Sequence, residues 1–353
     1  MRSEKYKSCV AAIALVASVL VAQQASAQDT MTITGYGGAA QTSQRKAYFE
    51  PFSKAEGVKV LEEEWSGETA KLRGMVETGN VTWDVVNVET GHALQGCAEG
   101  WLEKIDYGPL GGKGAFQPGA AFECGVGITA YGTVIAYDAS KFPNGGPQTL
   151  ADFWDVKKFP GARSLRRTPW STLEMALLAD GVKREDIYTV LGTPEGVNRA
   201  FKKLDEIKPY VKVWWTAGAQ PPQLLADGEV TMTTAYNGRI YNAVQESKKD
   251  FRIVWDGAAL DWDVWAIPKG TKHLDLAKKF LEFALRPENQ AEQTKYISYG
   301  PSRKEAAKLV DPAMLKNLPT AEENMKTAFN VSPEFWADHG EELTERFNNW
   351  IAQ

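Results

Sequence analysis

The chain has 353 residues, with 40 Lys and Arg against 45 Asp and Glu and a formal net charge of −5. A mildly acidic body argues against nucleic acid or an anionic lipid surface as the partner. The length exceeds what a single hydrophobic core usually supports, so two lobes are expected.

The N-terminus predicts a secretory signal peptide over residues 1–27. Basic residues precede the apolar run Cys9–Ala22, and Ala25–Ala27 has the small-x-small pattern of a cleavage site before Gln28. The run is too short and wrongly flanked for a membrane anchor, and Cys9 lies at its start, so a lipid-modified cysteine is not expected. Cleavage after Ala27 changes the formal charge from −5 to −7, since three basic residues and one acidic residue leave. The mature protein is expected in the periplasm.

Strand-like and helix-like segments alternate in the first part of the mature chain. Met31–Thr34 predicts a strand, the glycine-rich turn with Gly37 and Gly38 follows, and a helix continues to about Lys54. The next segments are a strand at Val58–Leu61, a helix at Thr69–Thr78, a nearly apolar strand at Trp83–Val88 and a long strand at Thr129–Tyr137. This alternation is the βαβ pattern, and a near-continuous apolar strand is typical of a parallel sheet.

A second alternating set spans Leu150–Ile267. Ser171 and Glu174 have the spacing of a capping box, which predicts a helix from there to Ala179. Further strands are predicted at Ser164–Arg167, Val211–Trp215, Val230–Thr234 and Arg252–Trp255. Asp275–Leu285 has one apolar helical face, and the tail after Pro312 is expected to be helical and to wrap one lobe.

Cys97 and Cys124 are the cysteines that remain after processing. In an oxidising compartment, two cysteines separated by a short loop are expected to form a disulfide, with two buried free thiols as the alternative. The histidines are scattered and share no metal-ligand spacing, so no metal and no cofactor are expected. The sequence contains no Gly-x-Ser-x-Gly elbow, P-loop or His-Glu-x-x-His motif, and an enzyme is therefore not expected.

The most informative segment places Trp262, Asp263 and Trp265 within four residues. A carboxylate between indole rings suits an organic cation, because the charge pairs with the acid while alkyl groups lie on aromatic faces. The alternative is a core strand that carries one exposed acid.

A series of short motifs runs in a fixed order along the mature chain. The motifs are Gly57–Val60, Trp83–Val86, Ala136–Asp138, Phe159–Gly161, Leu224–Val230, Tyr236–Arg239, Trp265–Gly270 and Tyr299–Pro301. This order resembles the periplasmic solute-binding components of ABC importers, in the spermidine/putrescine-binding branch. The resemblance implies an α/β fold of the two-lobed, type II-like kind, with ligand in the interlobe cleft and a hinged closure.

The resemblance also implies the lobes and the partners. The first lobe is expected to contain residues 28–137 plus 264–308, and the second lobe residues 138–263 plus 309–353. The closed form of the monomer is expected to dock onto an inner-membrane ABC permease.

Ligand contacts follow from the same resemblance, residue by residue. Asp263 matches the acid that binds an amine in the polyamine branch, Tyr236 and Tyr299 match two of its tyrosines, and Gly37 and Gly38 lie where its backbone approaches ligand. From the chain itself, Glu89 follows a buried strand, where open sheets place ligand contacts.

One departure changes the expected ligand. Polyamine binders carry a pair of acids at the turn that here reads Arg166 to Ser171, and two arginines precede this turn instead. Strand alternation allows at most one of Arg166 and Arg167 to point inward, and Arg167 is the expected contact. An arginine next to a helix start forms a carboxylate site, with Arg239 as the rival partner. The alternative for both arginines is a solvated surface pair.

Opposite charges at two ends of one pocket predict a zwitterion of the 4-aminobutyrate kind. The expected ligand contacts are Gly37, Gly38, Glu89, Arg167, Trp170, Ser171, Trp215, Tyr236, Arg239, Trp262, Asp263 and Tyr299. The aromatic members could instead be core residues. Four other classes stay open: a polyamine binder with Glu89 as second acid, a sugar binder, an iron binder built on Tyr236 and Tyr241, and a secreted enzyme.

Overall fold

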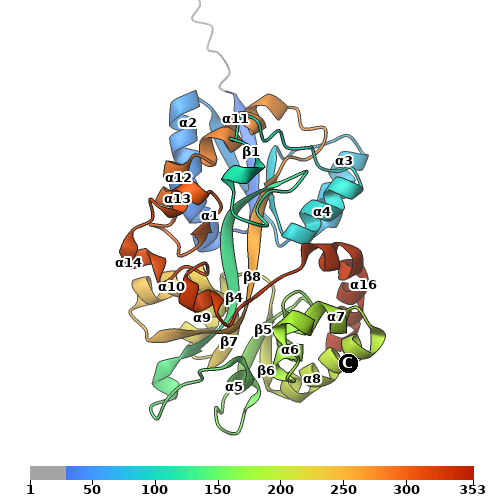
Figure 1. Ribbon diagram of the computed structural model, residues 1–353, viewed down its shortest axis with the longest axis vertical. Coiled ribbons are helices and arrows are strands. Elements are labelled where there is room, and N and C mark those ends of the chain that lie inside the picture. Colours follow the sequence, from blue (N-terminus) through green and yellow to red (C-terminus); the bar gives the residue numbers. More distant parts are fainter. Residues whose placement is uncertain (1–28) are drawn as a thin grey trace, which may run out of the picture.

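The computed structural model describes residues 29–353, so the predicted signal peptide and its cleavage site lie outside the described residues. One mixed 10-stranded sheet runs along the molecule in the order β2-β1-β3-β8-β4-β7-β5-β6, with β9 and β10 beside β4 and β8. Two long antiparallel strands, β4 (Val126–Asp138) and β8 (Phe251–Ala266), pass through its middle and connect the two ends (Figure 1).

The first lobe is built on three parallel strands. They are β1 (Thr30–Gly35), β2 (Lys59–Glu64) and β3 (Val85–Val88). Its helices are α1 (Gly38–Gln44), a π-helical turn at Arg45–Phe49, α2 (Glu50–Glu56), α3 (Thr69–Glu77), α4 (Thr90–Ala98), α11 (Leu274–Ala284), α12 (Pro287–Gln293) and α13 (Lys304–Ala307). Every residue of β3 is buried, because helices cover both faces of this sheet region.

The second lobe repeats this plan with β5 (Arg163–Arg166) parallel to β6 (Val211–Trp215) and to β7 (Met232–Tyr236). Its helices are α5 (Leu150–Trp154), α6 (Thr172–Ala179), α7 (Ile187–Leu191), α8 (Pro194–Ile207), α9 (Gln220–Ala226) and α10 (Asn237–Ser247). Short 3-10 turns lie at Lys113–Ala115, Ala139–Lys141, Arg184–Asp186 and Lys208–Tyr210. The fold is thus two-lobed α/β, as expected, while the residue bounds given for the lobes stay a prediction.

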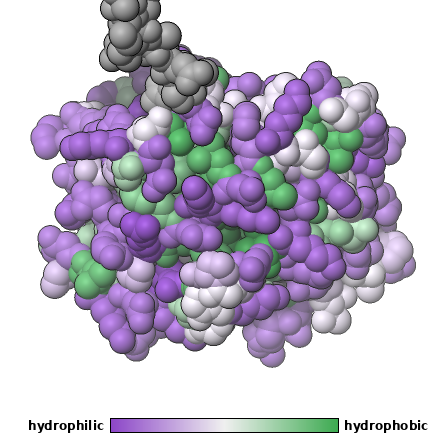
Figure 2. Space-filling view, turned by 90° about the horizontal axis from the view of Figure 1, so that it is seen from above, coloured by the Kyte–Doolittle hydropathy of each residue, from purple (hydrophilic) through white to green (hydrophobic). Residues whose placement is uncertain are grey.

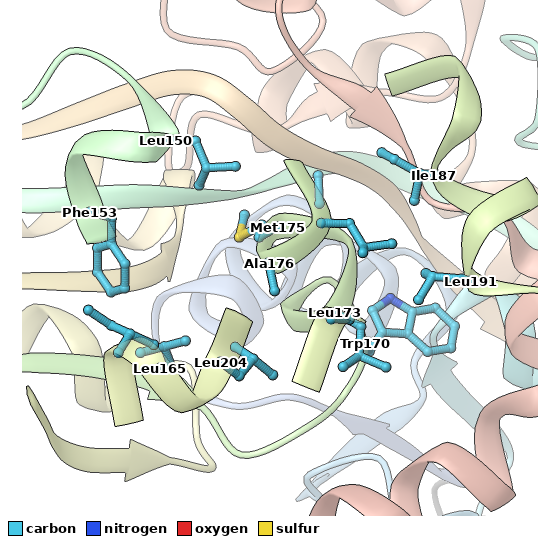
Figure 3. Packing of buried hydrophobic residues seen from close by; sticks show 14 of the residues in the cluster. Leu150, Phe153, Leu165, Trp170, Leu173, Met175, Ala176, Ile187, Leu191 and Leu204 are labelled. Carbon is cyan, nitrogen blue, oxygen red and sulfur yellow. The ribbon is translucent and has the colours of Figure 1, made fainter. Parts of the chain in front are cut away.

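Separate hydrophobic cores stabilise the two lobes. In the second lobe, Phe153, Leu165 and Leu204 gather from α5, β5 and α8 around α6 (Figure 3). In the first lobe, Phe52, Trp265 and Phe280 pack with their rings in edge or tilted contact. Seen from the end that carries α2 and α11, the surface is mainly hydrophilic around a smaller hydrophobic area (Figure 2).

Strand β8 is much longer than the sequence predicted. The expected strand spanned Arg252–Trp255, yet the strand continues to Ala266. Gly257 has φ +70° and lies so close to Leu150 that a Cβ would clash with that side chain. The glycine therefore permits a close approach within the strand rather than ending it.

The C-terminal tail contacts both lobes, which corrects the expectation that it wraps one. It contains α14 (Pro312–Leu315), α15 (Glu322–Met325), β10 (Phe329–Asn330) and α16 (Pro333–Ile351). Helix α16 packs Trp350 against Phe201 of the second lobe at a ring distance of 5.7 Å. Its Glu341 accepts hydrogen bonds from Arg73 and Gln95 of the first lobe at 2.8 and 3.1 Å.

Two local predictions have opposite outcomes. The Cys97–Cys124 disulfide is confirmed and ties α4 to the segment before β4. Helix α6 begins at Thr172 as expected, but the Ser171 side chain makes no capping hydrogen bond, because Ser171 adopts φ +61° in place of the extended conformation usual for a capping residue. Within residues 29–353, no helix is both long and apolar enough to cross a membrane.

Candidate functional site

The carboxyl ends of the parallel strands of both lobes face one cavity of about 170 Å³. Each of these strands contributes a lining residue at its end: Tyr36 after β1, Glu64 on β2, Glu89 after β3, Arg166 on β5, Thr216 after β6 and Tyr236 on β7. Crossing strand β8 adds Asp263. Open α/β sheets place ligands at such strand ends, because the loops there diverge.

Asp263 is the buried acid of this cavity. It lies opposite Thr129 of β4 with 7% of its surface exposed, and its carboxylate accepts no hydrogen bond from any residue in 29–353. Burial raises the pKa of Asp263 to about 7, while the positive charges of Arg239 and Arg166 oppose that shift and Glu89 adds to it. A cation that enters the cavity would stabilise the ionised carboxylate of such a buried acid, because a buried charge is costly unless it is paired.

Arg239 is the buried base, in the first turn of α10. Its Nη2 donates to the carbonyl oxygens of Tyr36 and Gly37 at 3.1 and 3.0 Å. Its Nε has no hydrogen-bond partner within residues 29–353. Glycines make room for it: a Cβ on Gly218 would lie 2.8 Å from Nε, and one on Gly38 would clash with Nη1. The guanidinium is therefore held in place while its Nε–H stays without a partner among residues 29–353.

Glu89 and Arg166 form an ion pair across the cavity. The Arg166 Nη1 to Glu89 Oε1 distance is 2.8 Å, and the side chains are only 13% and 7% exposed. The pair joins the β3–α4 junction of the first lobe to the end of β5 in the second lobe. These two charges neutralise each other inside the site.

Aromatic rings form the walls. Tyr36 stacks on Trp65 with centroids 6.0 Å apart, and Tyr131 meets Tyr236 edge-on at 5.3 Å. The Tyr36 hydroxyl has no partner in the described part of the chain, so it can hydrogen-bond a ligand. Rings with polar edges suit a ligand that has a short alkyl chain between polar ends.

A second buried acid, Asp261, contacts a wall residue of the cavity without lining it. Asp261 accepts hydrogen bonds from Thr90 Oγ1 at 2.8 Å and from Tyr131 at 3.4 Å. Burial raises the pKa of Asp261 to about 8, although the Thr90 hydroxyl favours the ionised form. Asp261 thereby fixes the wall residue Tyr131 and the start of α4.

The structure brings part of the predicted site together. Glu89, Tyr236, Arg239, Asp263 and Tyr299 all line the cavity. Gly37 and Gly38 do not line it but support Arg239. Their binding roles stay predictions.

Other predicted contacts lie away from the cavity. Arg166 lines it in place of Arg167, which directly follows the end of β5 and is exposed. Ser171 is buried outside it, and no residue of α6 lines it, so the expected helix-start site for a carboxylate is not part of this cavity and stays a prediction.

Three tryptophans that were predicted as cavity walls pack in or against the hydrophobic cores instead. Trp170 stacks on Trp336 at 5.0 Å, and Trp215 is fully buried and donates its Nε1–H to Thr234. Trp262 is partly buried and packs against the first-lobe cores. Alternation along β8 explains the last case, since Asp263 points to the cavity and its neighbour therefore points away.

Sequence reasoning missed Tyr36, Trp65 and Tyr131. The rule that ligand contacts follow strand ends was applied only after β3; the residues that follow β1 and β2 would have given Tyr36 and Trp65. Tyr131 lies in the middle of β4, where no sequence signal separates a wall from a core residue. No group of three or more His, Cys, Asp or Glu in residues 29–353 is arranged to hold a metal ion.

Two α/β lobes on crossing strands, with a polar and aromatic cavity between their strand ends, define a two-lobed ligand-binding protein. The family of bacterial extracellular solute-binding proteins matches residues 47–323, so the chain belongs to this family.

Similar sequences and solved structures indicate the same family. The chain is 48% identical to the gamma-aminobutyric acid-binding protein of Pseudomonas aeruginosa, over 94% of this chain and 93% of that protein. It is 24% identical to the spermidine/putrescine-binding periplasmic protein of Salmonella typhimurium, over 74% of this chain and 76% of that protein. The GABA receptor Atu4243 superposes with a TM-score of 0.81 at 35% identity, covering 92% and 98%. MotA of A. tumefaciens B6, solved in complex with glucopine, superposes with a TM-score of 0.86 at 35% identity, and the match covers 91% of this chain and 99% of MotA. These relatives are binding proteins or receptors.

Proposed function

We propose that the chain is the periplasmic substrate-binding subunit of an ABC importer and that it captures a 4-aminobutyrate-like amino acid. One observation carries this proposal. The same cavity contains an acid, Asp263, that accepts no hydrogen bond within residues 29–353, and a base, Arg239, whose Nε–H has no partner there. The ammonium group of the ligand would pair with Asp263, and the carboxylate of the ligand would pair with the Arg239 guanidinium.

The charge balance favours a zwitterion over other ligands. Among the buried lining residues, Glu89 and Arg166 cancel, which leaves one negative and one positive group. Glu64 is exposed at the rim and adds little to the buried balance. A neutral sugar would leave both buried charges without a counterion, and a diamine would meet Arg239.

The size and the aromatic lining of the cavity also favour a short amino acid as the ligand. A cavity of about 170 Å³ suits a short molecule. The methylene groups would lie against the rings of Tyr36, Tyr131 and Tyr236, where burial of apolar surface contributes affinity. The GABA-binding relatives at 48% and 35% identity support the same ligand class.

An iron site on the tyrosines is disfavoured. Burial raises the pKa of Tyr236 to about 12 and raises the pKa of Tyr131 and Tyr299 as well. Metal binding by phenolate would need the opposite shift. Tyr241, the other predicted iron ligand, does not line the cavity.

The family and the predicted signal peptide support export, with cleavage after Ala27 and delivery of ligand to an inner-membrane permease. The monomeric state is part of the same proposal.

Calorimetric titration of the mature protein tests the ligand. The ligands are 4-aminobutyrate, butyrate, n-butylamine, putrescine and a disaccharide. We expect 4-aminobutyrate to bind most tightly, because it alone satisfies both charged residues. Tighter binding of putrescine or of the disaccharide would reject the proposal.

A further inference from the structure

The Glu89–Arg166 ion pair is more than a structural link. Glu89 lies at the end of β3 in the first lobe and Arg166 at the end of β5 in the second, and both line the cavity. The N to O distance is 2.8 Å, and neither side chain has more than 13% of its surface exposed. Each lobe thus supplies the countercharge of the other at the position where ligand would lie.

Arg166 is positioned to keep this charge in place. Its guanidinium carbon lies 6.0 Å from the Trp215 ring and 5.7 Å from the Tyr236 ring. Its backbone N–H donates to Thr234 Oγ1 at 3.1 Å, which fixes the end of β5. Burial alone would lower the pKa of Arg166, but Glu89 and the nearby tyrosines raise it on balance, so the charge is permanent.

Without Arg166, the same cavity would contain two unpaired acids. Within residues 29–353, the hydrogen-bonded ion pair with Arg166 is the one ion pair that Glu89 makes. Asp263 is already without a hydrogen bond. Two free carboxylates in one small cavity are a receptor for two ammonium groups.

We propose that Arg166 determines specificity by neutralising Glu89 from the opposite lobe, so that the cavity accepts one ammonium group and rejects diamines. This inference rests on the proposed function, because it concerns how the same cavity separates amino acids from diamines. Selectivity then comes from a group that need not touch the ligand.

The test replaces Arg166→Gln and compares putrescine with 4-aminobutyrate by calorimetry. The buried charge balance becomes more negative by one unit, so we expect the ratio of putrescine affinity to 4-aminobutyrate affinity to rise by roughly tenfold or more. An unchanged or lower ratio would overturn the inference.

A double variant distinguishes charge masking from direct contact and guards against misfolding. Glu89→Gln together with Arg166→Gln removes both charges, so the ratio should return to that of the unchanged protein. If 4-aminobutyrate binding is lost equally in the single and double variants, Arg166 is a direct carboxylate ligand and the inference is wrong. Arg252→Gln, which breaks an exposed ion pair with Asp250, is the matched control and should change neither affinity.

Failure of the proposed function gives a different pattern. If the unchanged protein prefers putrescine, the proposed ligand class fails. If the unchanged protein prefers 4-aminobutyrate and Arg166→Gln leaves that preference intact, only the inference fails.

Discussion

Single residues show how far a pattern predicts a site. Asp263 could be predicted because an acid between tryptophans in a strand is unusual, and Arg239 because it follows a family motif. Arg167 was expected to face the cavity, but Arg166 lines it, because a shift of one residue decides which side chain faces the cavity. The tryptophans looked equally suitable for wall or core, and only the fold assigns Trp215 and Trp170 to the core.

Asp263→Asn should abolish high-affinity binding of 4-aminobutyrate. The variant keeps the shape of the side chain but removes the charge that would pair with the ammonium group, and we expect a loss of about 100-fold or more. Thermal stability should stay equal or rise, because the acid is buried without a partner. Calorimetry and thermal melts measure both. Retained affinity would contradict the assigned role.

Binding should depend on pH through Asp263. In the ligand-free protein the pKa of Asp263 is about 7, and an ammonium ligand needs the ionised form. Below this pH a proton must be released on binding, so affinity should fall by about tenfold per pH unit below about pH 6. Titrations from pH 5 to 8 in buffers of different ionisation enthalpy would show the released proton. A flat profile would contradict this linkage.

Asp261 should make the ligand-free protein less stable as pH rises. Its folded pKa of about 8 lies above the ordinary value, so between these two pH values the folded state binds more protons than the unfolded state. We expect a loss of roughly 1–3 kcal/mol between pH 5 and 8. Asp261→Asn should flatten this part of the stability curve in urea unfolding. Equal slopes in both proteins would argue against a raised pKa.

At the scale of elements, the sequence predicted which segments are strands and helices better than where they end. Helix α6 and strand β6 have the predicted bounds, because polar turns flank their apolar runs. Strand β8 and the turn at Ser171 were misread, since a close approach to Leu150 and a left-handed residue are tertiary features without a local signature.

The start of α1 offers a test of an element that supports the site. Gly38→Ala should weaken binding by tenfold or more, on the order of 1.4 kcal/mol, because the new Cβ would displace the Arg239 guanidinium. Gly228→Ala is the matched control: Gly228 also has positive φ, +70° against +57°, but a Cβ there meets nothing within 4 Å. Both variants should lose about 1 kcal/mol of stability, and only Gly38→Ala should lose affinity. Equal affinities would contradict the support role.

At the scale of the whole molecule, the family resemblance predicted the two-lobed fold, whereas composition alone gave only the expectation of two cores. The path of the tail could not be predicted. Helix α16 has one face for Phe347 and Trp350, but Glu341 looks like any exposed acid in the sequence. Its partners, Arg73 and Gln95, are set by how the two lobes meet.

The Cys97–Cys124 disulfide should stabilise the first lobe. It closes a segment of 27 residues, and the chain-entropy estimate gives about 3–4 kcal/mol. Replacing both cysteines by serine should lower the free energy of unfolding by that amount, measured by urea titration. Ligand affinity should persist where the variant is folded, because neither cysteine lines the cavity. An unchanged unfolding midpoint would contradict this estimate.

The residues around the cavity come from nearly the full length of the chain, from Tyr36 to Tyr299. A bound molecule therefore makes noncovalent contacts that hold together chain segments which meet only after both lobes have folded. No fragment that lacks either lobe can assemble the complete ring of contacts. Bound ligand should therefore raise the free energy of unfolding by about 2.7 kcal/mol when the free ligand concentration is a hundred times Kd, and the melting temperature should rise with it.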